Sequence, residues 1–155
     1  MSAEKRLAEL GLELPPPPRP VATYVTALRL GDLLYISGHG PWCGDGSLLT
    51  GKLGYDMDVP AGAAAARQTG LAILATIRHE LGSLDRVGQL VKTFGMVNAT
   101  PEFTEHPRVI NGFSDLMVEV FGASGKGARS AVGVASLPGN IAVEIEAVFL
   151  VRDEP

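Results

Sequence analysis

The stretch ARSAVGVASLPGNIAVEIEAVFLV, residues 128–151, decides the fold more than any other part of the chain. Its two ends, ARSAVGVAS and IAVEIEAVFLV, are rich in small and β-branched residues and indicate two strands. Between them, LPGN places proline and glycine where a tight turn needs them. The sequence therefore predicts a hairpin, and a register that pairs Ser136 with Ile141 would set Arg129 opposite Val148.

Strand and helix patterns alternate upstream of this hairpin. Residues 21–30, 32–38 and 89–99 indicate strands, and residues 60–81 and 107–121 indicate helices that each end at a glycine. The helices carry apolar and small residues at steps of three and four: Ala63, Ala66, Gly70, Ile73, Leu74, Ile77 and Leu81 in the first, Val109, Ile110, Phe113, Leu116, Met117, Val120 and Phe121 in the second. The order β-β-α-β-α-β-β predicts an α+β domain with two helices on one face of a mixed sheet.

The N-terminal segment has a different character from this body. Residues 2–10 indicate a short helix that ends at Gly11, and the run PPPPRP, residues 15–20, forms a stiff extended spacer. The sequence therefore predicts an extension over residues 1–20 followed by one domain over residues 21–155.

Composition limits the classes of function. The chain has 155 residues, a net charge of -4 and a sequence pI of about 5.3, so it offers no basic field for nucleic acid. Its single cysteine, Cys43, cannot form an internal disulfide. The N-terminus does not resemble a signal peptide, and no apolar run reaches the roughly 18 residues of a membrane span. These features predict a cytoplasmic protein that does not enter a membrane.

The segment GASGKGARS, residues 122–130, looks at first like a phosphate-binding loop. Such a loop needs a glycine where Val120 stands, a Ser or Thr where Gly127 stands, and a helix after it rather than before it. A nucleotide site is therefore excluded. The three histidines, His39, His79 and His106, have no paired spacing, which argues against a metal site.

Arg129 and Glu144 are the strongest candidates for chemistry. Arg129 carries a permanent charge in a planar fork that grips carboxylates, and the next residues on its side, Ala131 and Gly133, are small enough to leave a hollow. In the predicted register Arg129 and Glu144 lie on the same face of the hairpin, about 13 Å apart. This separation would let the two side chains contact opposite ends of a small molecule. A carboxylate without a neighbouring cation would have a raised pKa. On residues alone, a solvated arginine at a strand end and a solvated glutamate on a strand remain open alternatives.

Four fragments together resemble one known family. Tyr24-Val25, LLYISGHGP, ARSAVGVASLP and VEIEA occur in the order and spacing of the RidA/YjgF family over about residues 22–151. The resemblance implies a chorismate-mutase-like α+β fold that assembles as a homotrimer with sites between subunits. It also implies hydrolysis of reactive enamine or imine acids, such as 2-aminoacrylate, to 2-oxo acids and ammonia, for which no cofactor is expected.

The resemblance also assigns roles to particular residues. Arg129 matches the arginine that binds the substrate carboxylate, and Glu144 matches the acidic residue that positions or activates water. Further positions match residues that line the pocket: Tyr24, Ser37, Gly38, His39 and Asn111. The chain departs from the family at Ala131, where a cysteine is common, and at His39, where a glutamine is common, which indicates a divergent subgroup.

Three functions follow from these observations. The first is a 2-iminobutanoate/2-iminopropanoate deaminase-like hydrolase that acts on a small carboxylate-bearing metabolite. The second is a binding module for 2-oxo or amino acids that carries out no chemistry. The third is an endoribonuclease or translation inhibitor, a label that the family also carries. The acidic charge balance counts against RNA as the ligand.

Overall fold

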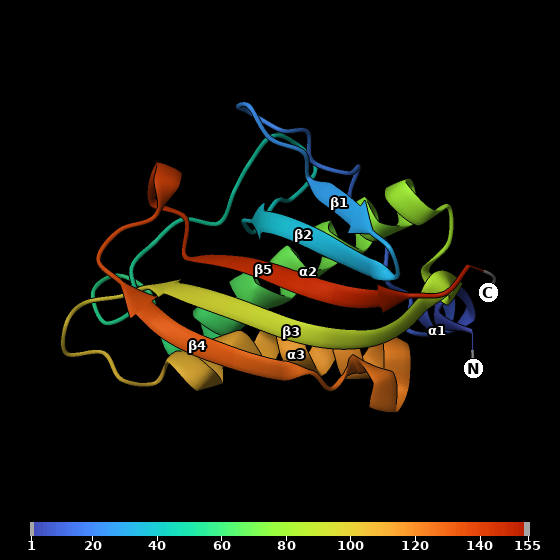
Figure 1. Ribbon diagram of the computed structural model, residues 1–155. Helices are drawn as coiled ribbons and strands as arrows, with labels where there is room; N and C mark the ends of the chain where they lie inside the picture. The colour runs from blue at the N-terminus through green and yellow to red at the C-terminus, as the bar shows by residue number, and fades with distance from the viewer. Residues whose placement is uncertain (1, 154–155) are drawn as a thin grey trace.

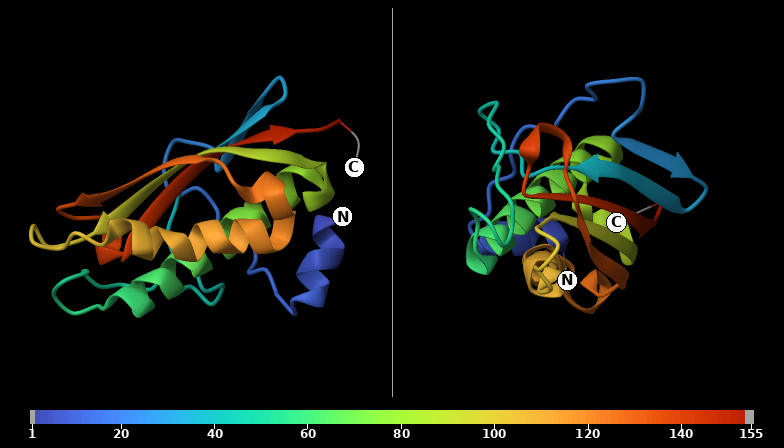
Figure 2. Two further views of the ribbon diagram at one scale, coloured as in Figure 1. Left: turned by 90° about the horizontal axis from the view of Figure 1, so that it is seen from below. Right: turned by 90° about the vertical axis from the view of Figure 1, so that its left-hand side faces the viewer.

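A computed structural model describes residues 2–153 and shows a five-stranded mixed sheet lying on a layer of helices (Figure 1 and Figure 2). The strands are β1 (Ala27–Leu30), β2 (Leu33–His39), β3 (Val87–Asn98), β4 (Ala128–Val134) and β5 (Val143–Val151). The helices are α1 (Ala3–Glu9), α2 (Val59–Leu81) and α3 (His106–Phe121), with short 3₁₀ helices η1 (Leu84–Arg86), η2 (Gly122–Gly125) and η3 (Pro138–Asn140). The predicted α+β class and element order are confirmed.

The strands lie in the order β1-β2-β5-β3-β4. Only the β3–β4 pair is parallel, and the other three pairs are antiparallel. Helices α2 and α3 cover one face of the sheet, as the left view of Figure 2 shows. We call the opposite face the open face; it carries Glu144, Glu146, Val148 and Leu150 of β5, Lys92, Phe94 and Met96 of β3, and Tyr35 of β2.

The predicted hairpin of residues 128–151 is wrong. The two strands form as expected, but β3 lies between them and pairs with both. The connection through η3 therefore crosses over one strand instead of closing a tight turn. Its residue Ala142 pairs elsewhere: the amide donates to the carbonyl of Leu49, and the carbonyl accepts from the amide of Asn98. Backbone groups in this connection are thus satisfied without a hairpin.

The two long helices agree closely with the sequence prediction. Helix α2 begins after Asp58, whose carboxylate accepts a hydrogen bond from the amide of Ala61 at 2.9 Å. It ends at Gly82, which has a left-handed φ of 81°. Gly112 of α3 lies directly against the backbone of Ala63, so no side chain fits between the helices at this point. The small residues of the α2 stripe thus permit close packing of α2 against α3.

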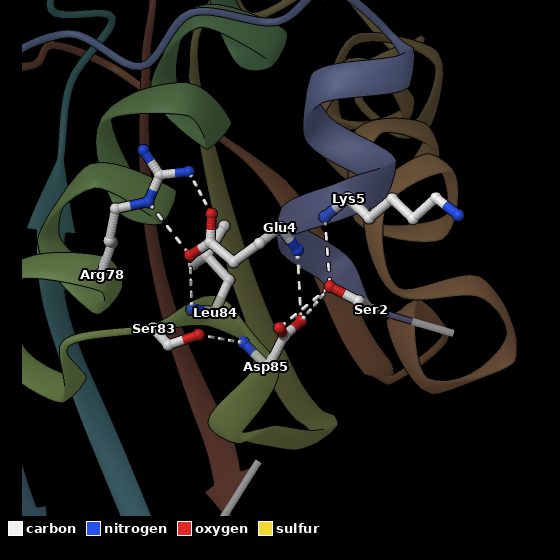
Figure 3. A network of polar contacts seen from close by, with 7 residues as sticks. All are labelled: Ser2, Glu4, Lys5, Arg78, Ser83, Leu84 and Asp85. Atoms are coloured by element: carbon white, nitrogen blue, oxygen red, sulfur yellow. Dashed lines mark hydrogen bonds and ion pairs between the residues drawn. The ribbon is translucent and has the colours of Figure 1, made fainter.

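Helix α1 packs against the body by both apolar and polar contacts. Leu7 is 3% exposed and belongs to the core cluster. The carboxylate of Glu4 accepts hydrogen bonds from Arg78 at 2.5 Å and from the amide of Leu84 at 2.9 Å (Figure 3). The hydroxyl of Ser2 donates to Asp85 at 2.9 Å. The division of the chain at residue 20 stays a prediction, but the first turns of the chain are anchored beside η1.

Candidate functional site

Glu144 and Gly38 form the centre of a first cluster, where the end of β2 meets β5. Glu144 lies half-buried on the open face of the sheet. A Cβ atom at Gly38 would lie only 2.7 Å from Oε1 of Glu144. Glycine at position 38 is therefore what leaves room for the carboxylate at this point.

The environment of Glu144 favours its protonated form. Burial raises the pKa of this carboxyl above the ordinary 4.5, and the negative charge of Glu146, two residues along the same face, raises the pKa further. Within residues 2–153, no cation pairs with Glu144. A half-buried carboxyl group with a raised pKa is a typical general acid or base.

Tyr24 and Ser37 border the open face next to Gly38: Ser37 precedes that glycine in the sequence, and Tyr24 lines a cavity together with it. Both line a cavity of about 570 Å³ that also reaches Glu146. The hydroxyl of Ser37 donates to the carbonyl of Val25 at 2.6 Å, which ties β2 to the segment before β1. The ring of Tyr24 remains 43% exposed, so it is accessible from this cavity on the open face.

His39 occupies the same turn, but its ring points away from Glu144 and into the core. Its Nδ1 lies 2.6 Å from the carbonyl of Ser37, and its Nε2 lies 2.8 Å from the hydroxyl of Thr76 on α2. Because a carbonyl can only accept, Nδ1 carries the proton and Nε2 accepts from Thr76. Burial lowers the pKa of His39 below its ordinary 6.5, and the bond to Ser37 offsets part of this effect. His39 is therefore a neutral structural residue whose backbone borders the cluster.

This burial predicts a pH-dependent stability. The unfolded chain binds a proton at His39 more readily than the folded chain, so the free energy of unfolding should fall as the pH drops below about 6.5. The limiting slope for one proton is about 1.4 kcal/mol per pH unit. Urea unfolding at several pH values between 5.5 and 7.5 measures this dependence of the unfolding free energy on pH. His39→Gln should remove this slope and the exposed His79→Gln should keep it; equal slopes in wild type and His39→Gln would refute the assignment.

Arg129 is the centre of a second cluster, on the edge strand β4. It pairs with the buried Thr93 of the adjacent strand β3, so its side chain lies on the helix face of the sheet. Nη1 donates to the hydroxyl of Ser114 at 3.1 Å, and Nη2 donates to the carbonyl of Pro107 at 3.4 Å. In the part of the chain that the structure describes, no carboxylate pairs with this guanidinium. The charge of Arg129 therefore remains available to an anion.

Asn111 belongs to the same edge. Pro107, Asn111 and Ser114 follow each other at steps of four and three along α3, so they share one side of the helix. Asn111 is exposed there. Sequence reasoning missed Ser114, although its place among the apolar residues of α3 and its spacing from Asn111 were visible signals.

Two expectations about Arg129 are wrong. The hollow expected beside Ala131 and Gly133 is occupied at Gly133, because the imidazole of His106 packs directly against that glycine. The small residues of β4 therefore make room for the first turn of α3, and the ligand space must lie elsewhere.

The second correction concerns the sheet faces. In the row of residues that crosses the sheet at Arg129, Thr93 of β3 and Ala147 of β5 lie beside it. Glu144 lies in a different row, with Met96 of β3 and Val132 of β4. Because side chains alternate along a strand, Arg129 lies on the helix face and Glu144 on the open face. The two groups cannot bracket one small molecule within a single chain. The structure thus brings Tyr24, Ser37, Gly38, His39 and Glu144 together at one place and Arg129 and Asn111 at another.

The fold agrees with a known family. The sequence profile described as "YjgF/chorismate_mutase-like, putative endoribonuclease" matches residues 4–150. The chain belongs to this YjgF family. The matched residues include both clusters and all of the helices and strands except the first residue of α1 and the last residue of β5. The chorismate-mutase-like fold expected from the resemblance is confirmed.

Three known proteins are similar to this chain over most of their length. Protein TCP17 of Trypanosoma cruzi is 43% identical over 92% of this chain and 89% of its own. The 2-iminobutanoate/2-iminopropanoate deaminase of Escherichia coli K12 is 32% identical over 87% of this chain and 92% of its own. The crystal structure of Atu1372 from Agrobacterium tumefaciens superposes with a TM-score of 0.87 at 41% identity, over 97% of this chain and 92% of that one.

Residues 2–153 lack the features of two other kinds of site. No three side chains among His, Cys, Asp and Glu come together as metal ligands would. None of the helices combines the length and the apolar character that a bilayer crossing requires.

Proposed function

We propose that this chain hydrolyses reactive enamine or imine acids of the 2-aminoacrylate type, in their imine form, to 2-oxo acids and ammonia. The observation that carries the proposal is the half-buried carboxyl group of Glu144, which lies against Gly38 with a raised pKa and has no paired cation among the described residues. The guanidinium of Arg129, which has no carboxylate partner within residues 2–153, supports it. The similarity to a deaminase over most of both chains supports it as well.

The proposed reaction needs only positioning and proton transfer. Arg129 binds the carboxylate of the substrate and so fixes the carbon of the C=N bond. Glu144 takes a proton from a water molecule as the water oxygen bonds to that carbon, and the C=N double bond becomes a single bond. The nitrogen gains protons and leaves as ammonia when the C=O bond forms. One water is consumed, one 2-oxo acid and one ammonia are released, and Glu144 returns to its starting state.

A complete site of this kind requires a second copy of the chain. Arg129 and Glu144 lie on opposite faces of the sheet, so the cation of one copy must meet the carboxylate of another. The open face suits such an assembly because large apolar side chains stand exposed on and beside it: Leu28, Leu30, Tyr35, Val132 and Leu150. We therefore include a homotrimer with sites between subunits in the proposal.

The trimer predicts a specific mass in solution. Light scattering at micromolar concentration should give about three times the 16.2 kDa of one chain. Tyr35→Glu should lower this mass, because it places a charge in the buried interface. A wild-type protein that remains monomeric across this concentration range would refute the assembly and, with it, the shared site.

The reaction is tested with imines generated in situ by an amino-acid oxidase. Purified protein should accelerate the appearance of the 2-oxo acid over the uncatalysed rate. If the rate with protein equals the uncatalysed rate for every imine, the chain is not an imine hydrolase. Calorimetry with 2-oxo acids then decides whether it is a binding module, which would still release heat in a manner that depends on Arg129.

A further inference from the structure

A cavity of about 620 Å³ lies between the proline-rich extension and the end of β2. We call it the extension pocket and define it by its apolar walls: Pro16, Pro17, Pro18, Trp42, Leu48 and Ile141. The extension reaches this place from α1, and in Figure 1 its blue trace runs beside the teal segment that follows β2. The fold thus uses residues far apart in sequence to enclose a mostly apolar space.

The walls of the extension pocket are held in place by specific contacts. The indole Nε1 of Trp42 donates to the carbonyl of Pro16 at 3.1 Å, and the carbonyl of Trp42 accepts from Gln68 of α2 at 2.7 Å. Consecutive prolines are stiff and have no amide proton to satisfy, so they can form an apolar wall without unpaired donors. Trp42 and the prolines therefore form a preorganised surface.

The extension pocket begins at the same glycine that faces the candidate catalytic carboxylate. Gly38 lines the pocket, and the position of its missing Cβ is 2.7 Å from Oε1 of Glu144. Tyr24 also lines both the extension pocket and the cavity on the open face. At Gly40, a Cβ would lie 3.0 Å from Ile141, so glycine there keeps the space open. A molecule bound beside Glu144 could therefore extend into the extension pocket.

Resting on the proposed function, we propose that the extension pocket receives the side chain of the substrate. This assigns the chain to 2-imino acids with large apolar or aromatic side chains rather than to the three-carbon 2-aminoacrylate. A three-carbon acid would leave most of 620 Å³ unfilled, whereas a pocket of this size suits a considerably larger ligand. The walls of proline, Trp42, Leu48 and Ile141 favour burial of apolar surface. The one charged side chain among the lining residues, Arg19, would repel a cationic side chain of the substrate.

Turnover tests the preference directly. For wild type, kcat/KM for the imine derived from leucine should exceed that for the imine derived from alanine by about tenfold or more. Trp42→Ala should remove most of this advantage by raising KM for the large imine, and Trp42→Phe, which keeps an apolar ring, should restore part of it.

Tyr55→Ala is the matched control, because Tyr55 is an aromatic residue 81% exposed on a different loop. A wild type that prefers the small imine, or a Trp42→Ala variant that slows both imines equally, would overturn the pocket assignment while leaving the imine hydrolase intact.

Binding provides a second measurement that does not depend on turnover. Trp42 is the only tryptophan of the chain, so its fluorescence reports on the extension pocket alone. Titration with 4-methyl-2-oxopentanoate should change this fluorescence at lower concentration than titration with pyruvate. If the change occurs without turnover of any imine, the hydrolase proposal fails and the pocket stands as a binding site for branched 2-oxo acids. If neither acid changes the fluorescence, the pocket assignment fails.

Discussion

Arg129→Ala is expected to lower kcat/KM for imine hydrolysis by about a hundredfold or more. The loss follows because the substrate carboxylate would enter a partly dehydrated site without its charged partner, and removal of one member of such a pair usually costs about 2–5 kcal/mol. Arg129→Lys should fall between wild type and Arg129→Ala, since lysine keeps the charge but loses the planar fork that binds two oxygens. Initial rates over a range of imine concentrations measure the effect.

The control for Arg129 is another arginine outside both clusters. Arg152→Ala removes an exposed cation from the end of the chain beyond β5 and should leave kcat/KM within about twofold of wild type, as expected for a surface substitution. An Arg129→Ala variant with wild-type kcat/KM would show that the carboxylate is bound elsewhere. An equal loss of kcat/KM in Arg129→Ala and Arg152→Ala would show that the effect comes from the net charge of the protein and not from a contact of Arg129 with the substrate.

Glu144→Gln is expected to lower kcat by about a hundredfold or more, because general acid–base catalysis typically contributes 10²–10⁴-fold. Glutamine has nearly the same shape and can fill the place against Gly38, but it cannot exchange a proton with water. A reduced kcat with little change in KM would therefore separate a catalytic role from a binding role. Unchanged kcat would leave Glu144 without a catalytic function.

The pKa of Glu144 adds a pH dependence to this prediction. As a base, Glu144 must be ionised, so activity should rise with pH through its pKa, which burial and Glu146 place above the ordinary 4.5. Glu146→Gln removes the neighbouring negative charge and should lower the pKa of Glu144. The acidic limb of the pH–rate profile should then move to lower pH. A shift in the opposite direction would contradict the assignment.

The sequence predicted the elements of the fold but not the neighbours of β4 and β5. The periodicity and the terminal glycines of α2 and α3 are local signals, so their bounds agreed with the structure within one residue. The choice of strand partner is not local. Nothing in LPGN reveals that β3 is inserted between the two strands, because β3 bonds to both of them through its two edges.

The error in strand order also changed the geometry of the candidate site. A direct hairpin would have aligned Arg129 with Val148, whereas the structure aligns it through Thr93 with Ala147. A difference of one residue moves a side chain to the other face of a sheet. The identities of Arg129 and Glu144 as candidates came from the sequence, but their separation into two clusters required the register.

The extension pocket shows a further limit of the sequence. Proline composition predicts a segment without helix or strand, as residues 12–20 are, but it does not reveal which surface the segment contacts. The hydrogen bond between Trp42 and Pro16 joins residues 26 positions apart. Each of these residues is unremarkable alone, and only the folded chain brings them together beside Gly38.

Mixing two impaired variants tests the shared site most directly. Arg129→Ala keeps Glu144, and Glu144→Gln keeps Arg129, so a site between two copies can be restored when each copy supplies its intact half. Random reassembly of equal amounts should restore about a quarter of the wild-type activity, since one arrangement in four pairs the intact halves at a given interface. No recovery above the separate variants, in a mixture shown to exchange subunits, would contradict a site shared between copies.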